Sequence, residues 1–324
     1  MHVQAPLHGA AWGVILVGLL FTGIRLAVPL LLAALGETLA EKSGVINVGM
    51  EGMMLAGALA GFAAAFGTHS PWAGAGAAIL AGVILAALFA ALSVGLGADQ
   101  VVVGTAINIL ALGLTGVFFR AVPQLNGATA AAFAPFSLPF LHPANGAAPS
   151  LPALLLSALF EQNALGWLAW ALVPLVWLGL FKTRWGLRLR ATGEYPQAAD
   201  GAGVRVGRVR VAATLAGGAL AGLAGAYLSL GYTVGFGENM TAGRGFIALA
   251  VVILGRWNPF GVAAAALLFG LASALQFQFQ ASSTRFPYQF FLALPYLLTL
   301  LALLGRSKLG GAAPAALGES YRRG

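Results

Sequence analysis

Apolar runs of about 20 residues recur along this chain and constrain its fold more than any other feature. A helix of about 20 residues crosses a hydrocarbon core roughly 30 Å thick. Within lipid, only helices and closed barrels satisfy all of their own backbone polar groups. Composition agrees, since 60% of the residues are hydrophobic and 8% are charged, whereas about a quarter are charged in an average soluble chain. We therefore expect an all-α integral membrane protein.

The apolar runs between helix-breaking residues predict nine membrane-spanning segments. They cover 11–35, 44–66, 72–97, 101–119, 160–181, 211–233, 244–256, 257–280 and 287–305. The first is long enough, with Gly23 and Arg25 inside it, to form two helices, so the bundle has nine or ten spans. The segment 244–256 is short, and we expect either a full crossing or a broken, re-entrant half-helix buried in protein.

These spans define a transmembrane domain at 11–305, between an N-terminal segment, 1–10, and a tail, 306–324. The tail is polar and rich in Gly and Ala, so we expect it to lack fixed structure.

Seven of the seventeen Lys and Arg residues lie in one loop, 182–210. Such basic loops stay in the cytoplasm. Counting spans outward places six more on the same side: Lys42, Arg256, Arg306, Lys308, Arg322 and Arg323. The remaining four fall outside or in the outer half: Arg25, Arg120, Arg244 and Arg285. The opposite orientation would invert this ratio of thirteen to four. The sequence therefore predicts a multi-pass protein of the plasma (inner) membrane, with the loop and the C-terminus cytoplasmic.

Signatures of enzymes and metal sites are missing from the sequence. It contains no GxxxxGK[ST] phosphate loop, no GxSxG elbow and no HExxH pair. There is no cysteine, and the four histidines share no metal-ligand spacing. We therefore expect a chain that is not an enzyme and has no catalytic residue, metal or cofactor. Any ATP hydrolysis would belong to a partner chain.

Acidic side chains cluster where the first span ends. Glu37 and Glu41 share a helix face, which is equally typical of a solvated helix end. Glu51 lies inside an apolar span, where an ionised carboxylate costs about 2.5–3.5 kcal/mol and has to face protein or water. Three glycines surround it: Gly44, Gly49 and Gly52. They would permit a broken helix that exposes backbone polar groups to a substrate.

Four residues are candidates for a pathway of a polar, uncharged solute. Asn47 and Glu51 belong to the cluster just described, Asn108 lies in the middle of the fourth span, and Gln276 lies near the outer end of the eighth. For each residue, a purely structural polar contact between helices is the alternative interpretation.

The basic loop contains a short, well-delimited insert. Pro196 suits a helix start, because it has no N–H to leave unpaired there. Gly201 and Gly203 suit a helix end. The pattern predicts a short cytoplasmic helix at about 195–201. Ala198 and Ala199 would give it a low surface that fits a partner's groove.

Three blocks of the sequence resemble a known family. Residues 35–54 (LGETLAEKSGVINVGMEGMM) look like the N-terminal signature of ABC permeases for nucleosides, within the larger family of ribose and branched-chain amino-acid permeases. The insert at 193–203 resembles that family's coupling helix. Residues 243–250 and 255–259 (GRWNP) resemble its third conserved block. The resemblance covers most of residues 23–305.

The resemblance implies a partner set: ABC ATPase subunits, a second related permease that makes a heterodimer or a homodimer, and an extracytoplasmic substrate-binding lipoprotein. It also implies that ATPase motion enters the membrane at the positions Gly193, Glu194, Pro196, Ala198, Ala199 and Gly203. Tyr195 stands where the family pattern has Asn, which puts the capping of this helix in question.

The leading hypothesis is therefore an ATP-driven nucleoside importer subunit that works by alternating access. A simple sugar, a flavin or an amino acid remains an alternative solute. From a different class, an ion-coupled secondary transporter would use Glu51 as its proton or sodium site. An intramembrane enzyme is disfavoured because catalytic residue sets are missing. No interaction with nucleic acid is expected, since the basic residues report topology.

Overall fold

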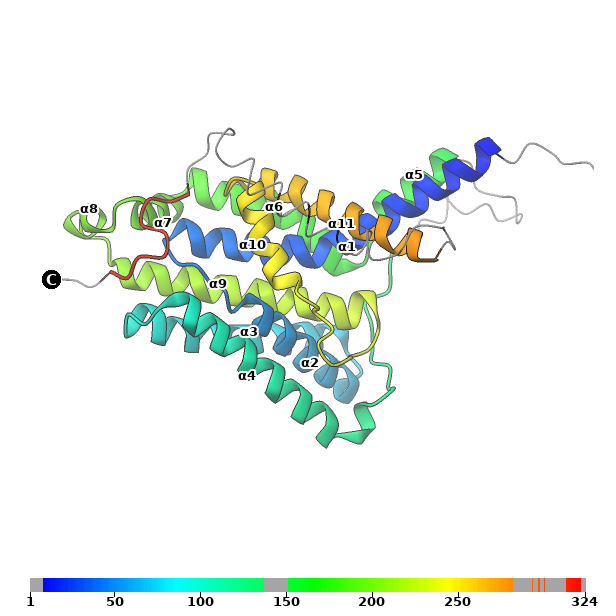
Figure 1. Cartoon of the computed structure of the whole chain (residues 1–324), viewed down its shortest axis with the longest axis horizontal. Helices are drawn as coiled ribbons and strands as arrows, with labels where there is room; N and C mark the ends of the chain where they lie inside the picture. The colour runs from blue at the N-terminus through cyan, green and yellow to red at the C-terminus, as the bar shows by residue number, and fades with distance from the viewer. Residues whose placement is uncertain are drawn as a thin grey trace, which may run out of the picture.

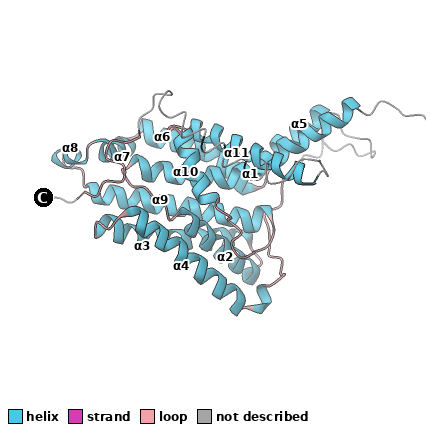
Figure 2. Cartoon of the chain, in the orientation of Figure 1, coloured by secondary structure: helices cyan, strands magenta, loops and turns pink. Residues whose placement is uncertain are grey.

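The computed structural model describes residues 8–136, 151–281, 293, 297, 300 and 313–321. In this part of the chain every regular element is a helix, as Figure 2 shows. The α-helices are α1 (His8–Lys42), α2 (Met50–Thr68), α3 (Pro71–Ala90), α4 (Gln100–Ala121), α5 (Leu151–Phe160), α6 (Ala164–Lys182), α7 (Arg184–Glu194), α8 (Pro196–Gly201), α9 (Val206–Ala226), α10 (Arg244–Leu254) and α11 (Pro259–Ala281). The π-helical turns η1 (Ala91–Gly95) and η4 (Tyr227–Tyr232) extend α3 and α9, and a 3-10 turn, η2 (Pro123–Leu125), follows α4.

The expected all-α membrane architecture is confirmed in outline. Seven of the described helices are long and apolar enough to cross a membrane, and they correspond to seven of the nine predicted spans. The predicted span 287–305 lies outside the described residues, apart from three isolated positions. The segment predicted at 244–256 contains α10, which has 11 residues. At a rise of 1.5 Å per residue such a helix is about 16 Å long, roughly half of a hydrocarbon core.

The first span differs from the two-helix alternative. Helix α1 runs unbroken for 35 residues and continues through Pro29. Gly23 lies within the continuous helix, and its close contact with Leu271 of α11 leaves no room for a side chain there. Arg25 is tolerated because its Nη2 donates to the carbonyl oxygen of Gly231 at 3.0 Å. Tertiary contacts therefore keep this helix whole.

Helix α9 is central to the packing, because it contacts α1, α2 and α3. A Gly-Ala-Leu-Ala-Gly pentapeptide occurs at 57–61 in α2 and at 218–222 in α9, and these copies meet. A β-carbon added at Gly57 would lie 2.5 Å from the carbonyl oxygen of Gly222. Backbones this close require small residues, as in many membrane helix pairs.

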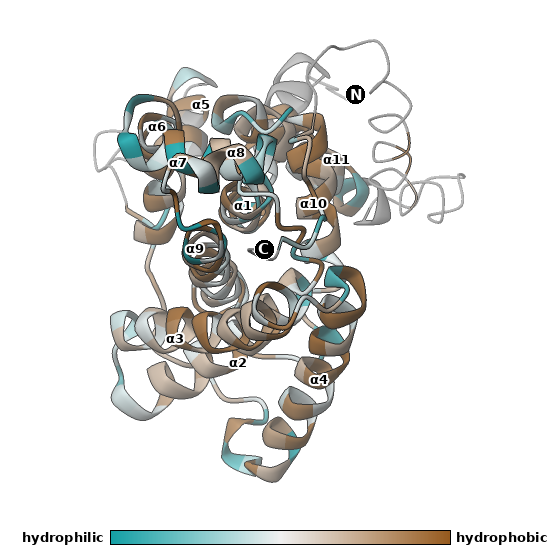
Figure 3. Ribbon diagram, turned by 90° about the vertical axis from the view of Figure 1, so that its left-hand side faces the viewer, coloured by the Kyte–Doolittle hydropathy of each residue, from teal (hydrophilic) through white to brown (hydrophobic). Residues whose placement is uncertain are grey.

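Large apolar side chains also cover the outside of the bundle. Figure 3 shows hydrophobic residues on the outward ribbons of α4 and α11. On α4 the side chains of Val102, Ile109 and Phe118 are each about two-thirds exposed. An outer face of this kind fits lipid or another membrane-embedded chain, and does not fit water.

The two ends of the bundle differ in charge. Figure 1 shows α7, α8 and the described C-terminal residues together at one end, called the α8 end below, with α5 at the other. Lys42 lies at the α8 end, where its carbonyl oxygen faces Gly193. At the opposite end Arg120 and Glu238 form a salt bridge of 3.3 Å. The basic loop and Lys42 therefore share one end, as the predicted topology requires.

Candidate functional site

Two helices begin beside each other in the interior of the bundle. Helix α2 begins at Met50, after the non-helical segment 43–49, and α10 begins at Arg244. Glu51 lies between the two N-termini. Its carboxylate accepts the N–H of Gly243 at 2.8 Å and the N–H of Gly245 at 2.6 Å. Helix N-termini carry partial positive charge, so the start of α10 is a favourable place for an acidic side chain. The predicted break in the chain is therefore present, and Glu51 caps the second helix.

Asn108 and Asn47 hold the start of α2 in place. The Asn108 side chain, in the middle of α4, accepts the N–H of Gly52 at 2.8 Å and donates to the carbonyl oxygen of Val48 at 2.9 Å. The Asn47 Oδ1 accepts the N–H of Gly49 at 3.1 Å. These side chains satisfy backbone groups that the broken helix leaves without partners.

The structure thus gathers three of the four candidate pathway residues around one break. Asn47 is buried, Glu51 is 9% exposed, and Asn108 is half-buried. Gln276 does not join them. It is half-buried on α11, which packs against α1, α6 and α10.

Glu37 and Glu41 form a buried site whose setting could not be read from the sequence. They are 0% and 3% exposed, which excludes the solvated helix end. Glu37 Oε1 accepts the N–H of Asn47 at 2.8 Å. Glu41 Oε2 accepts the indole N–H of Trp257. The pair therefore ties the inner end of α1 to the segment 43–49 and to the turn between α10 and α11. The four-residue spacing was the only signal in the sequence.

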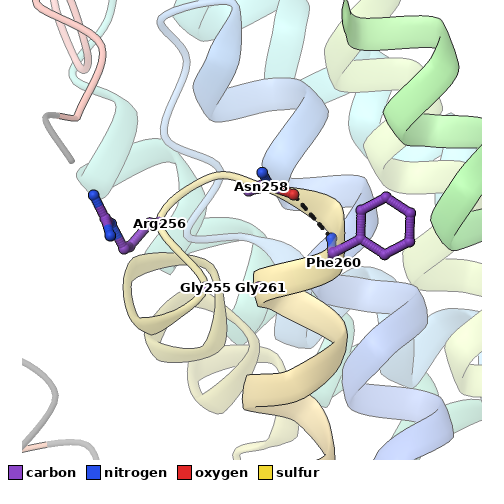
Figure 4. Close-up of a pocket in the computed structure, with 5 residues that line it drawn as sticks. All are labelled: Gly255, Arg256, Asn258, Phe260 and Gly261. Atoms are coloured by element: carbon purple, nitrogen blue, oxygen red, sulfur yellow. Dashed lines mark hydrogen bonds between the residues drawn. The ribbon is translucent and has the colours of Figure 1, made fainter.

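The α10–α11 turn has an unusual backbone. Arg256 and Trp257 both have positive φ, 57° and 53°, a conformation that non-glycine residues adopt at a cost. The result is that Trp257 is buried while Arg256 is exposed. Figure 4 shows Arg256 pointing away from the helix pair, beside a pocket of about 440 Å³ that Asn258 and Phe260 also line.

The insert in the basic loop folds as expected. Thr183 Oγ1 caps α7 by accepting the N–H of Gly186 at 3.1 Å. Helix α8 begins at Pro196 and ends at Gly201, and Gly203 follows with φ of 84°. Tyr195, whose place in the family pattern put the capping of this helix in question, is the N-cap residue of α8 and makes no side-chain capping hydrogen bond.

The six residues of the insert divide into two groups. Three are buried within their own chain: Gly193, Pro196 and Ala199. Three are exposed: Glu194, Ala198 and Gly203. Ala199 is only 5% exposed, so of the two alanines expected on an outer surface Ala198 alone is available to a partner.

A cationic hollow of about 400 Å³ lies beside α8. Arg188, Arg205 and Arg208 line it together with Trp185. All three arginines are exposed, and none forms a salt bridge with a described residue. The hollow is therefore positively charged, and no described acidic residue forms an ion pair with these arginines.

The α7–α8 segment contacts the end of α1 directly. A β-carbon on Gly193 would lie 2.3 Å from the carbonyl oxygen of Lys42. Thr192 Oγ1 donates to the carbonyl oxygen of Ser43 at 3.4 Å. The end of α7, directly before α8, therefore contacts the start of the segment 43–49, which contains Asn47 and leads to Glu51.

Residues 313–321 were expected to lack fixed structure, but they pack on the α8 end. Figure 1 shows them in red beside α7 and the start of α9. Ala316 is 4% exposed, and its N–H donates to the carbonyl oxygen of Gly193 at 2.9 Å. This contact could not be predicted from the sequence. The segment 313–321 has no periodic hydrophobic pattern, and its partner Gly193 lies far away in the chain.

The chain is similar to known transport proteins over most of its length. The family model described as branched-chain amino acid transport system / permease component matches residues 19–303. The guanosine ABC transporter permease protein NupQ of Bacillus subtilis is 37% identical, over 92% of this chain and 94% of its own. The nucleoside ABC transporter permease protein NupC of Lactococcus lactis subsp. cremoris is 36% identical, over 90% and 93%. TsgC13 of Haloferax volcanii, provisionally named a glucose ABC transporter permease, is 37% identical, over 94% and 98%. No solved structure matches the chain.

Proposed function

Since this chain belongs to the permease family of branched-chain amino acid transport systems, we propose that it is the membrane-spanning subunit of an ATP-driven nucleoside importer. Its relatives are ABC permeases of the nucleoside and sugar type. The nucleoside as solute is supported by two of these names, the guanosine permease NupQ and the nucleoside permease NupC. A simple sugar is the second candidate, because TsgC13 carries the name of a glucose permease.

One observation supports this proposal above the others: the α7–α8 segment is in contact with the break at residues 43–49. Gly193 abuts the carbonyl oxygen of Lys42, and Thr192 bonds to that of Ser43. In our account the partner ATPase docks on the exposed side of α8, around Ala198 and the free arginines. Nucleotide binding moves α8, and the movement reaches the start of α2.

The α8 end is then cytoplasmic, in agreement with the basic loop. The opposite end would face the substrate-binding lipoprotein. The apolar outer face of α4 would be covered by lipid or by the second permease. These assignments of side and partners follow from the proposed function.

In the proposed pathway, α10 is a re-entrant half-helix, and its N-terminus meets that of α2 near the bilayer midplane. Broken helices let a transporter present backbone donors and acceptors to a solute without exposing them to lipid. Asn47, Glu51 and Asn108 shape this break, and Gln276 would line the outer vestibule. Alternating access would open the break to one side of the membrane and then to the other.

The ion-coupled alternative requires Glu51 to bind and release a proton or sodium ion. Both of its carboxylate oxygens accept backbone N–H groups from the start of α10. Protonation would turn one acceptor into a donor that faces another donor. The geometry therefore favours a structural role for the Glu51 carboxylate over ion binding.

Reconstitution tests the proposal. The chain, a second permease, the ATPase and the binding protein are placed in proteoliposomes with ATP on the α8 side. We expect guanosine uptake that requires ATP hydrolysis and needs no ion gradient. Uptake by the purified chain alone, driven by an ion gradient, would contradict it. Uptake of glucose but not guanosine would keep the importer and change its solute.

A further inference from the structure

Residues 313–321, here called the strap, bind three separate elements at the α8 end. The Ala316 N–H donates to the carbonyl oxygen of Gly193, after which α7 ends, at 2.9 Å. The Gly318 N–H donates to the carbonyl oxygen of Gly44, in the break after α1, at 3.0 Å. The Glu319 carbonyl oxygen accepts Nη1 of Arg210, on α9. The strap therefore joins the insert, the break and the central helix.

Side-chain contacts reinforce this attachment. Leu317 packs on the hydrophobic core, and Tyr321 donates its hydroxyl to Asp200 of α8 at 3.1 Å. Gly318 has φ of 82°, and a β-carbon there would lie 3.2 Å from Cδ1 of Ile46. This glycine is required both by its left-handed backbone and by its close approach to the break.

Arg210 on α9 hydrogen-bonds both the break and the strap. It is 2% exposed, and its Nε donates to the carbonyl oxygen of Ser43 at 3.2 Å. Through Nη1 the same guanidinium holds Glu319. Burying a cation is costly unless it is well hydrogen-bonded. Here the planar fork bridges two main-chain segments, which an apolar side chain of similar size could not do.

We propose that the strap is a positioning element for coupling: it holds the α7–α8 segment to the break at 43–49, so that the two move as one body. This inference rests on the proposed function. Without the strap, the insert and the break keep the Thr192 hydrogen bond, at 3.4 Å, and the packing of Gly193. A movement of α8 would then be passed on incompletely.

Deletion of residues 313–321 tests the proposal in the full reconstituted complex. Guanosine uptake and ATP hydrolysis are both measured, and their ratio is the readout. We expect uptake per ATP to fall about fivefold or more while ATP hydrolysis stays within about twofold, the range of ordinary coupling energies. If uptake per ATP is unchanged, the positioning role is wrong. This holds whether both activities are intact or both fall by the same factor.

A point substitution provides a milder version with a matched control. Gly318→Val adds a branched side chain at a positive φ beside Ile46, so it should loosen the strap and lower uptake per ATP. Ser320→Val introduces the same residue at an exposed position two residues further on, and the ratio should stay at the wild-type value. Equal effects of the two substitutions would count against the proposal.

Disulfide cross-linking tests whether the strap stays attached to the insert throughout the transport cycle. The chain has no cysteine, and the Ala315 N–H lies 3.3 Å from Oε2 of Glu194. The pair Glu194→Cys and Ala315→Cys should form a disulfide, and uptake per ATP of this variant should be the same before and after oxidation. Loss of uptake on oxidation, restored by a reductant, would show that the strap has to detach.

If the wild-type complex shows no ATP-driven uptake, the proposed function itself fails. That result is different from a changed value of uptake per ATP.

Discussion

Glu51 stabilises the meeting point of α2 and α10, and its substitution distinguishes a structural role from an ion-binding one. In Glu51→Gln, an amide N–H₂ replaces one oxygen and faces a backbone N–H of Gly243 or Gly245. A lost hydrogen bond to a charged group and an unsatisfied donor together cost about 1–3 kcal/mol. We expect a lower thermal unfolding temperature of the detergent-purified chain, and reduced uptake that still requires ATP.

The pH dependence of uptake is the control for this prediction. If the role of Glu51 is structural, the profile of uptake against pH should have the same shape in wild type and in Glu51→Gln. Uptake that is strongly pH-dependent in the wild type, and abolished by Glu51→Gln with no nucleotide present, would instead support an ion site.

Trp257 connects the α10–α11 turn to α1 through one hydrogen bond, to Glu41. Trp257→Phe keeps an aromatic ring but removes the indole donor from a buried carboxylate. Removing one hydrogen-bond donor from a buried carboxyl group costs about 1–3 kcal/mol. We expect a lower unfolding temperature in detergent for Trp257→Phe. Trp185→Phe on the exposed side of α7 is the control and should have little effect. Similar losses in both variants would contradict the role of this bond.

Sequence reasoning at the residue scale succeeded where the cause was local. Gly44, Gly49 and Gly52 predicted the break before α2, because glycine lowers the cost of an irregular backbone. The burial of Glu37 and Glu41 was not predictable in the same way. Glu41 binds Trp257, which is 216 residues away in the chain, and no local pattern reports such a contact.

The short helix α8 presents its two alanines to different surroundings. Ala199 is 5% exposed and packs within the chain, while Ala198 is exposed. Forcing a large side chain into a packed site costs about 1–3 kcal/mol, so Ala199→Leu should lower the unfolding temperature. Ala198→Leu should leave it unchanged and reduce ATPase binding. If Ala198→Leu lowers the unfolding temperature and Ala199→Leu does not, α8 is rotated from the position described here.

Helices were predictable where an apolar run, or Pro and Gly residues at the helix ends, marks them in the sequence. The apolar runs located seven membrane-length helices, and Pro196 with Gly203 delimited α8 correctly. The continuity of α1 was not evident, because contacts of Gly23 and Arg25 with α11 and η4 preserve it. The strap was missed for a similar reason. Its Ala- and Gly-rich sequence has no periodicity, and its order comes from main-chain bonds to Gly193 and Gly44.

At the scale of the whole molecule, the α8 end and the interior break are linked. The insert and the strap lie at this end (Figure 1). The strap contacts the segment 43–49 at Gly44, and the α10–α11 turn contacts the last turn of α1 at Glu41. The segment 43–49 leads to the N-terminus of α2, which meets the N-terminus of α10 at Glu51. The proposed coupling route from α8 to the pathway therefore consists of contacts within this chain.

Labelling of a single cysteine tests most directly whether α8 is the cytoplasmic docking site for the ATPase. Ala198→Cys is introduced into this cysteine-free chain, and Ala121→Cys, exposed at the opposite end, is the control. A membrane-impermeant maleimide should label Ala198→Cys in inside-out vesicles, and assembly with the ATPase should block this labelling. Ala121→Cys should be labelled only from the other side and without protection. Labelling of Ala198→Cys from the outside, or labelling that the ATPase leaves unchanged, would contradict the account.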